Sequence, residues 1–94
     1  MPVMHFRVRW PDDTEMRCYS PSLVIKDYLK PGEAYALDEF LARSREALGI
    51  ASERVRAKFG RPCALALGQL RQIEEQAARF ALRPRAEVRV IGFD

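Results

Sequence analysis

The residues of greatest chemical reactivity in this chain are two cysteines and one histidine. Cys18 and Cys63 lie far apart without a CxxC motif, and His5 is the only histidine. A structural zinc site normally takes four Cys and His ligands, so these residues do not predict a metal site. A nucleophilic triad needs a base beside its nucleophile, and the alternation near the N-terminus puts His5 and Cys18 on opposite faces of a sheet. The sequence therefore predicts no catalytic set and implies no metal or other cofactor.

Cys63 is the better candidate for a reactive thiol. Pro62 predicts the first turn of a helix at this point, where the helix dipole lowers the pKa of a thiol. Cys63 also falls in line with Leu67, Leu70 and Ile73, which favours the simpler interpretation of a small buried hydrophobic residue. Cys18, expected to point inward, has the same interpretation.

The segment from Cys18 to Ser22 offers a second kind of chemistry. Tyr19, Ser20 and Ser22 carry hydroxyl groups beside Arg17, and the backbone at this point could present free N–H groups. Such donors together suit a carboxylate or a phosphate, although the same residues also form ordinary capped turns. No glycine-rich phosphate loop is present, so nucleotide hydrolysis is not predicted.

Two strands must position these residues. Residues 3–10 alternate and place an apolar set on one face: Met4, Phe6, Val8 and Trp10. Pro11-Asp12-Asp13 has the composition of a turn, and residues 14–19 alternate again with Met16 and Cys18 inward. A three-residue loop opposes Trp10 with Thr14 and Phe6 with Cys18, a register that satisfies both strands.

The outer face of this sheet is expected to collect cations and aromatic rings. The residues concerned are Arg7, Arg17, Arg89, His5, Tyr19 and Phe93. Arg7 then opposes Arg17, which is unfavourable unless an anionic group lies nearby. Cations and rings of this kind bind single-stranded RNA, but Glu15 and Glu87 share the face and the net charge is only +3, which makes nucleic acid an unfavoured partner.

The same face also carries apolar or amphipathic groups that no helix is left to cover. These are Val3, Tyr19, Ile91 and Phe93. A contiguous exposed patch of this type marks a protein interface or a homodimer more often than any other site.

Two amphipathic helices are predicted between about residues 37 and 81. Apolar residues recur at helical spacing on both sides of a break at Gly60-Arg61-Pro62. Gly60 suits the left-handed residue that ends a helix, and Pro62 suits the first turn of the next. A helix over residues 37–59 spans about 34 Å and an eight-residue strand about 26 Å, so residues 55–59 should overhang the sheet unless Gly49 kinks the helix.

These elements predict a single α+β domain over residues 1–94 in the order ββααβ. A break at Arg83-Pro84-Arg85 precedes a last strand over residues 87–93, with Val88 and Val90 on one face. The expected sheet has three strands in the order 2-1-3, with the two-helix hairpin packed on one face. The direction of the last strand depends on where residues 20–36 cross the sheet, and a strand parallel to the first is favoured. Residues 20–36 form either a short helical turn that begins at Ser20 or an extended segment along the sheet edge.

The composition of the chain indicates the cellular compartment in which it is expected. No stretch of 18 apolar residues and no signal sequence is found, so the chain is expected to be cytoplasmic, with no membrane partner and no disulfide. Its 13 arginines against three lysines reflect either phosphate binding or, more simply, a compositional bias.

Four segments resemble a small bacterial family labelled "nitrogen starvation response". They are residues 8–12 (VRWPD), 17–24 (RCYSPSLV), 35–45 (YALDEFLARSR) and 51–56 (ASERVR), and the similarity covers nearly the whole chain. The chain departs from the family pattern at Asp13, where glycine is usual, and at Arg61, where an aromatic residue is usual.

The resemblance implies a context rather than a site. Members are encoded in gene clusters with a nitrilase, a radical SAM enzyme, an acetyltransferase and a flavoprotein, linked to nitrogen-poor growth or nitrile use. The sequence thus predicts a non-catalytic accessory or protein-interaction protein with a protein partner or a homo-oligomeric state. The alternatives are a small-anion or substrate-binding protein, even an enzyme, that uses the Cys18–Ser22 stretch, and a weak single-stranded nucleic-acid binder.

Overall fold

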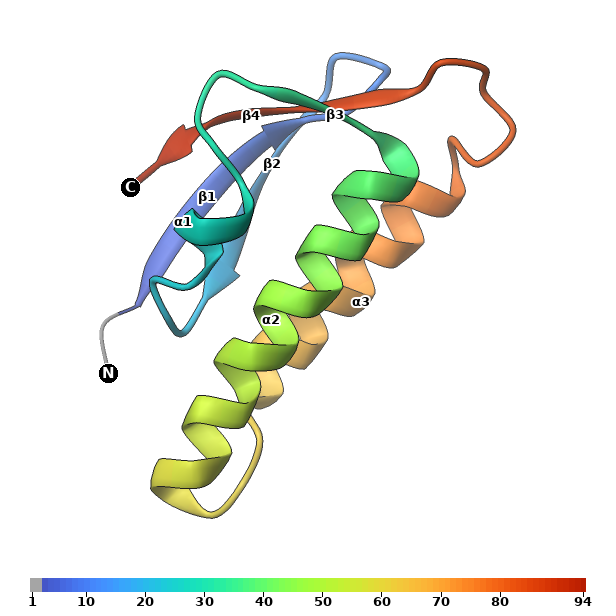
Figure 1. Cartoon of the computed structure of the whole chain (residues 1–94). Helices are drawn as coiled ribbons and strands as arrows, with labels where there is room; N and C mark the ends of the chain where they lie inside the picture. The colour runs from blue at the N-terminus through green and yellow to red at the C-terminus, as the bar shows by residue number, and fades with distance from the viewer. Residues whose placement is uncertain (1–2) are drawn as a thin grey trace.

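A computed structural model describes residues 3–94. Two strands, β1 (Met4–Arg9) and β2 (Glu15–Ser20), are followed by a one-turn helix, α1 (Ile25–Tyr28), and a short strand, β3 (Ala34–Ala36). Two long helices, α2 (Leu37–Phe59) and α3 (Ala64–Ala78), precede the last strand, β4 (Glu87–Phe93). The helices lie together on one side of the sheet (Figure 1).

The predicted register of the first two strands is confirmed. Phe6 pairs with Cys18 and Val8 with Met16, while the backbone N–H of Trp10 donates to the carbonyl of Thr14. Alternate residues of β1 are buried, as the period of two requires. The inward side chains form one core with α1, β4 and the two long helices: Met4, Phe6, Val8, Trp10, Cys18, Ile25, Leu29, Phe40, Leu48, Ile73, Val88 and Val90.

The predicted three-stranded sheet is wrong, because the sheet has four strands in the order β2-β1-β4-β3. The missed strand, β3, is held against β4 by hydrogen bonds from Gly32 N–H to the Val90 carbonyl and from Leu37 N–H to the Ala86 carbonyl. Three residues are too few to show an alternating pattern, so only the pairing with β4 identifies this segment as a strand.

The predicted direction of the last strand is also wrong, because β4 runs antiparallel to β1. The segment from α1 to β3 carries the chain along the sheet, so that α2 starts beside Ala86. The helical hairpin leaves this end and returns to it (Figure 1), and β4 must therefore run back along β1 in the opposite direction.

The linker after β2 follows neither proposed path completely. Helix α1 begins at Ile25 with Val24 at its N-cap rather than at Ser20, and it lasts a single turn. Residues Ile25 and Leu29 are completely buried, so this turn closes one end of the core.

The helical hairpin matches its prediction closely. Helix α2 ends at Gly60 in the left-handed conformation with φ 83°. Its far end extends past the sheet in Figure 1, and Phe59 there is 62% exposed, which confirms the predicted overhang. The two helices are joined at this end by a hydrogen bond from Cys63 N–H to Ser52 Oγ.

Gly49 within α2 and Gly60 at its C-cap give a matched test of this helix end. Gly60→Ala is expected to lower the free energy of unfolding by about 1 kcal/mol, since alanine tolerates φ 83° poorly. Gly49→Ala lies within the helix and meets open space, so it should raise stability by about 0.5–1 kcal/mol. Urea unfolding followed by circular dichroism measures both changes, and equal effects from the two variants would contradict this description of Gly60.

Candidate functional site

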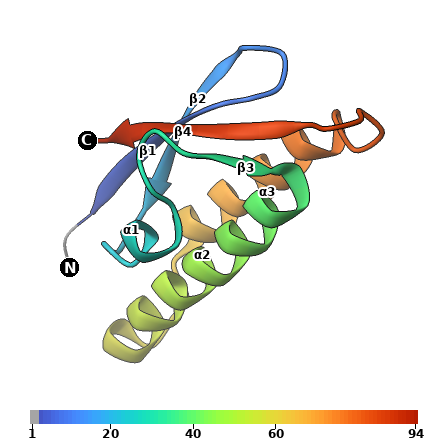
Figure 2. The ribbon, with the colours of Figure 1, turned by 45° about the horizontal axis from the view of Figure 1, so that its top comes forward.

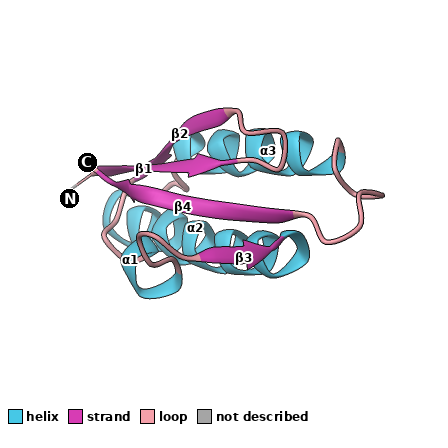
Figure 3. Cartoon of the chain, turned by 90° about the horizontal axis from the view of Figure 1, so that it is seen from above, coloured by secondary structure: helices cyan, strands magenta, loops and turns pink. Residues whose placement is uncertain are grey.

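The outer face of the sheet brings several of the predicted site residues together. Figure 3 shows the helices together beneath the sheet, with nothing above the strands. The register sets Arg7 opposite Arg17 and Arg9 opposite Arg89, and all four side chains are exposed. Like charges directly opposite each other destabilise a sheet, so this arrangement needs compensating anions.

Carboxylates of the chain compensate two of the four arginines. Arg9 forms an ion pair with Glu15 at 2.8 Å, which raises the pKa of that guanidinium, and Arg17 lies 3.3 Å from the Asp94 carboxylate. Arg89 donates to the backbone carbonyl of Gly32 at 2.8 Å. Within residues 3–94 no carboxylate lies at ion-pair distance from Arg7.

Tyr19 and His5 form the aromatic part of this face. Their rings meet edge to face with centroids 5.8 Å apart. His5 exchanges two backbone hydrogen bonds with Asp94, so the backbone of its partner Tyr19 points outward from the edge of the sheet. Gln69 Oε1 of α3 accepts the Tyr19 N–H at 3.0 Å, and the helix thus covers part of an otherwise open edge strand.

The predicted position of Phe93 on the outer face is wrong. The pairing of β1 with β4 shifts between Arg7 and Val8, so that Val8 opposes Val90 whereas Phe6 opposes Phe93. The shift gives β4 one extra residue, and a strand with an extra residue turns the following side chains to the other face. Phe93 therefore packs against the core, and the outer face has less apolar surface than expected.

The hydroxyls of the Ser20–Ser22 turn are engaged within the fold. Both serines are buried, and Ser20 Oγ donates to the Ser22 carbonyl at 2.7 Å. Ser22 Oγ accepts hydrogen bonds from Val24 N–H and from the Arg54 guanidinium. These contacts describe the capped turn rather than an open anion site.

The two thiols differ in their surroundings. Cys18 is completely buried, and this burial raises the pKa of its thiol to about 12, as expected for an inward core residue. Cys63 is half-buried at the N-cap of α3, immediately before the helix rather than in its first turn as predicted, and lies close to the Tyr19 hydroxyl. Desolvation, with a smaller contribution from Cys63, raises the pKa of Tyr19. Within residues 3–94 no group of three Cys, His, Asp or Glu side chains is placed to hold a metal ion.

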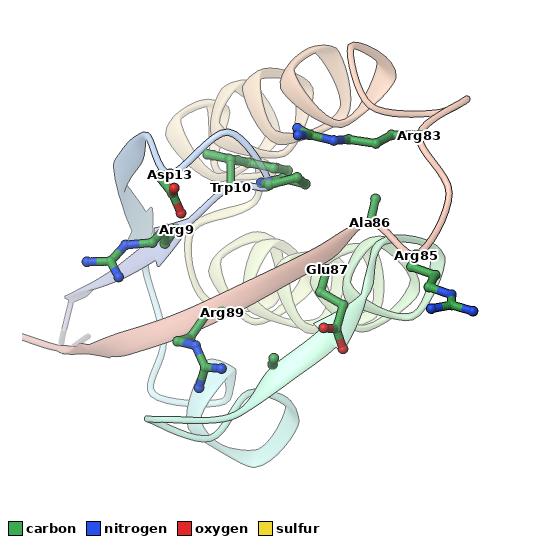
Figure 4. Close-up of a pocket in the computed structure, with 10 residues that line it drawn as sticks. Arg9, Trp10, Asp13, Arg83, Arg85, Ala86, Glu87 and Arg89 are labelled. Carbon is green, nitrogen blue, oxygen red and sulfur yellow. The ribbon is translucent and has the colours of Figure 1, made fainter.

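The sequence patterns do not predict one further feature, a hollow of about 280 Å³ between the β1–β2 turn and the start of β4. Its lining includes four arginines, Arg9, Arg83, Arg85 and Arg89, together with Trp10 and the two carboxylates Asp13 and Glu87. In Figure 4, Arg83 lies on the side of Trp10, Arg89 lies across β4, and Arg85 points away from the others. The sequence pattern of Arg83-Pro84-Arg85 predicts only a helix break, and the two arginines that flank the proline are the one local signal of this hollow.

The hollow exists because two neighbouring strands separate. Regular pairing of β1 with β4 ends at Arg9 and Arg89, and Figure 2 shows the β1–β2 turn diverging from β4 beyond that point. The side chains at the gap therefore come from segments far apart in the sequence.

The fold and these sites define a small α+β protein with one helix-covered and one open sheet face. None of the helices within residues 3–94 has the length and apolar composition needed to cross a membrane. The family model described as nitrogen starvation-induced protein NitG matches residues 5–93, and the chain belongs to this family. Comparisons with curated proteins and with solved structures gave no match.

Proposed function

We propose that this chain is a non-catalytic accessory protein in nitrogen-starvation metabolism that binds a partner protein through the outer face of its sheet. The observation that carries the proposal is the position of the three helices, which cover one face and leave the arginine-rich face open (Figure 3). Burial of Cys18 and the engagement of the Ser20 and Ser22 hydroxyls within the fold favour this interpretation over chemistry at the Cys18–Ser22 stretch.

The charges on this face favour an acidic partner. Arg7 opposes Arg17, whose charge is only partly balanced by Asp94, and has no carboxylate of its own among residues 3–94. A carboxylate of a partner would relieve this repulsion, and arginine is among the residues enriched in interfaces. The exposed edge of β2 lies next to this face and enlarges the surface that a partner could contact.

Candidate partners follow from the family context. The resemblance places a nitrilase, a radical SAM enzyme, an acetyltransferase and a flavoprotein in the same gene clusters. Each of these enzymes, purified from the organism that supplies this chain, is a defined ligand for a binding assay. A homodimer is the remaining partner and is detected by sedimentation.

Charge reversal at Arg7 tests the proposed face. Arg7→Glu is expected to weaken partner binding by at least about tenfold, since it replaces a complementary charge by a repulsive one at the centre of the face. Arg71→Glu, on the solvent side of α3, makes the same charge change and should alter binding by less than about twofold. Biolayer interferometry with each clustered enzyme at two salt concentrations measures both variants.

Three outcomes would contradict the proposal. In the first, the four enzymes fail to bind and the chain sediments as a monomer. In the second, Arg7→Glu and Arg71→Glu both bind the partner as tightly as the unchanged protein does. In the third, the chain shifts single-stranded RNA in a gel with a steep salt dependence. The last result would favour the nucleic-acid alternative.

A further inference from the structure

We propose that the hollow between the β1–β2 turn and β4 is a binding site for a phosphate group, with Arg83 and Arg85 as its main ligands. The hollow shares Arg9 and Arg89 with the outer face, but its proposed main ligands lie in the loop before β4 and phosphate binding needs no partner protein. Its volume of about 280 Å³ is just below the range typical of small-molecule pockets, so the ligand is small.

The balance of charge in the hollow favours an anion. Four arginines and two carboxylates line it, which leaves an excess of positive charge. Arg9 is held by Glu15, and Arg89 donates to the Gly32 carbonyl. The guanidinium groups of the two remaining arginines form no ion pair or hydrogen bond with residues 3–94, and both residues are exposed; the Arg83 guanidinium lies 6.0 Å from the centroid of the Phe80 ring.

Arg83 and Arg85 can therefore turn toward a ligand without breaking an ionic contact. Each guanidinium has five N–H donors in a planar fork, which matches the oxygens of phosphate. The two arginines flank Pro84 in one short loop, and Arg85 must rotate inward from the position drawn in Figure 4. Phosphate presents oxygens in several directions and can accept from both, whereas a planar carboxylate engages one fork well.

Trp10 adds an independent observation. It lines the hollow, it is only 2% exposed, and its indole Nε1 is buried without an acceptor among residues 3–94. Buried N–H groups in proteins are nearly always paired, so an orphan beside a basic hollow indicates a missing acceptor. An oxygen of a bound anion would supply one once a shift of the indole opens Nε1 to the hollow.

The backbone conformation of Arg85 also supports the proposal. Arg85 adopts φ 58°, a conformation in which glycine is favoured, and thus keeps a charged side chain at a strained position. A position of this kind that lines a hollow is a functional candidate. Replacement by glycine should remove the guanidinium and relax the backbone together.

Fluorescence gives a direct test, because Trp10 is the only tryptophan of the chain. We expect inorganic phosphate, added at constant ionic strength, to change Trp10 fluorescence saturably with a half-saturation in the millimolar range. The Arg83→Ala/Arg85→Gly variant should bind at least about tenfold more weakly. The matched Arg61→Ala/Arg71→Ala variant removes two exposed charges elsewhere and should bind within about twofold of the unchanged protein.

Three further arms complete the experiment. Arg85→Gly alone should weaken binding while raising the melting temperature, which separates the ligand role from a structural one. A sugar phosphate that binds tighter than inorganic phosphate identifies an ester as the natural ligand, and equal binding identifies the free ion. Absence of saturation, equal weakening in the control variant, or acetate binding as tightly as phosphate would each overturn the proposal.

Discussion

Replacement of Trp10 by alanine is expected to lower the free energy of unfolding by roughly 3–5 kcal/mol. The indole lies between the two long helices and the sheet, edge to face with Phe40 at 5.6 Å and stacked on Phe80 at 6.1 Å. Its loss removes a large apolar surface and leaves a cavity that these rings cannot fill without shifting. A domain of this size has a total stability of about 5–15 kcal/mol, so the variant should lose roughly a fifth of this stability or more.

Two companion variants make this prediction specific. Trp10→Phe keeps an aromatic ring and removes the unpartnered Nε1, so its cost should be about 1–2 kcal/mol. Leu82→Ala removes a leucine that is 99% exposed and should change stability by less than about 0.5 kcal/mol. Urea unfolding followed by circular dichroism measures all three. A Trp10→Ala cost no larger than that of Leu82→Ala would refute the assigned core.

The second large effect is a loss of stability at alkaline pH that originates at Cys18. Burial raises the pKa of this thiol from 9.0 to about 12 in the folded protein. Below pH 9 the thiol is protonated in both states and its contribution does not change. Between pH 9 and 12 the unfolded chain loses the proton while the folded chain keeps it, so unfolding is favoured by about 1.4 kcal/mol per pH unit and about 4 kcal/mol in total.

Cys18→Ala isolates this contribution. The variant is less stable at pH 7 because it loses a buried side chain, but its stability should fall much less steeply between pH 9 and 11. The pKa values of Tyr19 and Tyr28 are also raised mainly by desolvation. Both the variant and the unchanged protein should therefore retain a smaller decrease in the free energy of unfolding with rising pH. Equal slopes for the variant and the unchanged protein would show that the Cys18 thiol ionises normally in the fold.

The parts of this protein that sequence reasoning predicted correctly are those specified by local periodicity. The alternation of residues 3–10 and 14–19 defines which side chains of β1 and β2 face inward, and the register that satisfies both is the one observed. The 3.6-residue period and the Gly60 break define the helical hairpin with its ends nearly in place. Helix α3 is the exception in detail, since Leu67 is 47% exposed whereas Gln69 is buried against β2.

The candidate site was predicted only in part, because its composition depends on pairings between distant segments. Arg7, Arg17, Arg89 and Tyr19 were placed correctly on the outer face by alternation. Ser20 and Ser22 were placed in the right turn, but their hydroxyls are engaged by contacts that include Arg54, 32 residues away from Ser22. The arginine-lined hollow combines the first turn with the last loop, and no local pattern joins these two segments.

The sequence by itself therefore determined which side chains of β1 and β2 face inward, and approximately where the two long helices begin and end. The tertiary structure alone decided three things: that Ala34–Ala36 is a strand, that β4 runs antiparallel to β1, and that the pairing shift turns Phe93 toward the core. The physical reason is common to all three. Local period is a property of one segment, whereas strand pairing, strand direction and bulges are settled by which backbone groups of other segments are available for hydrogen bonding.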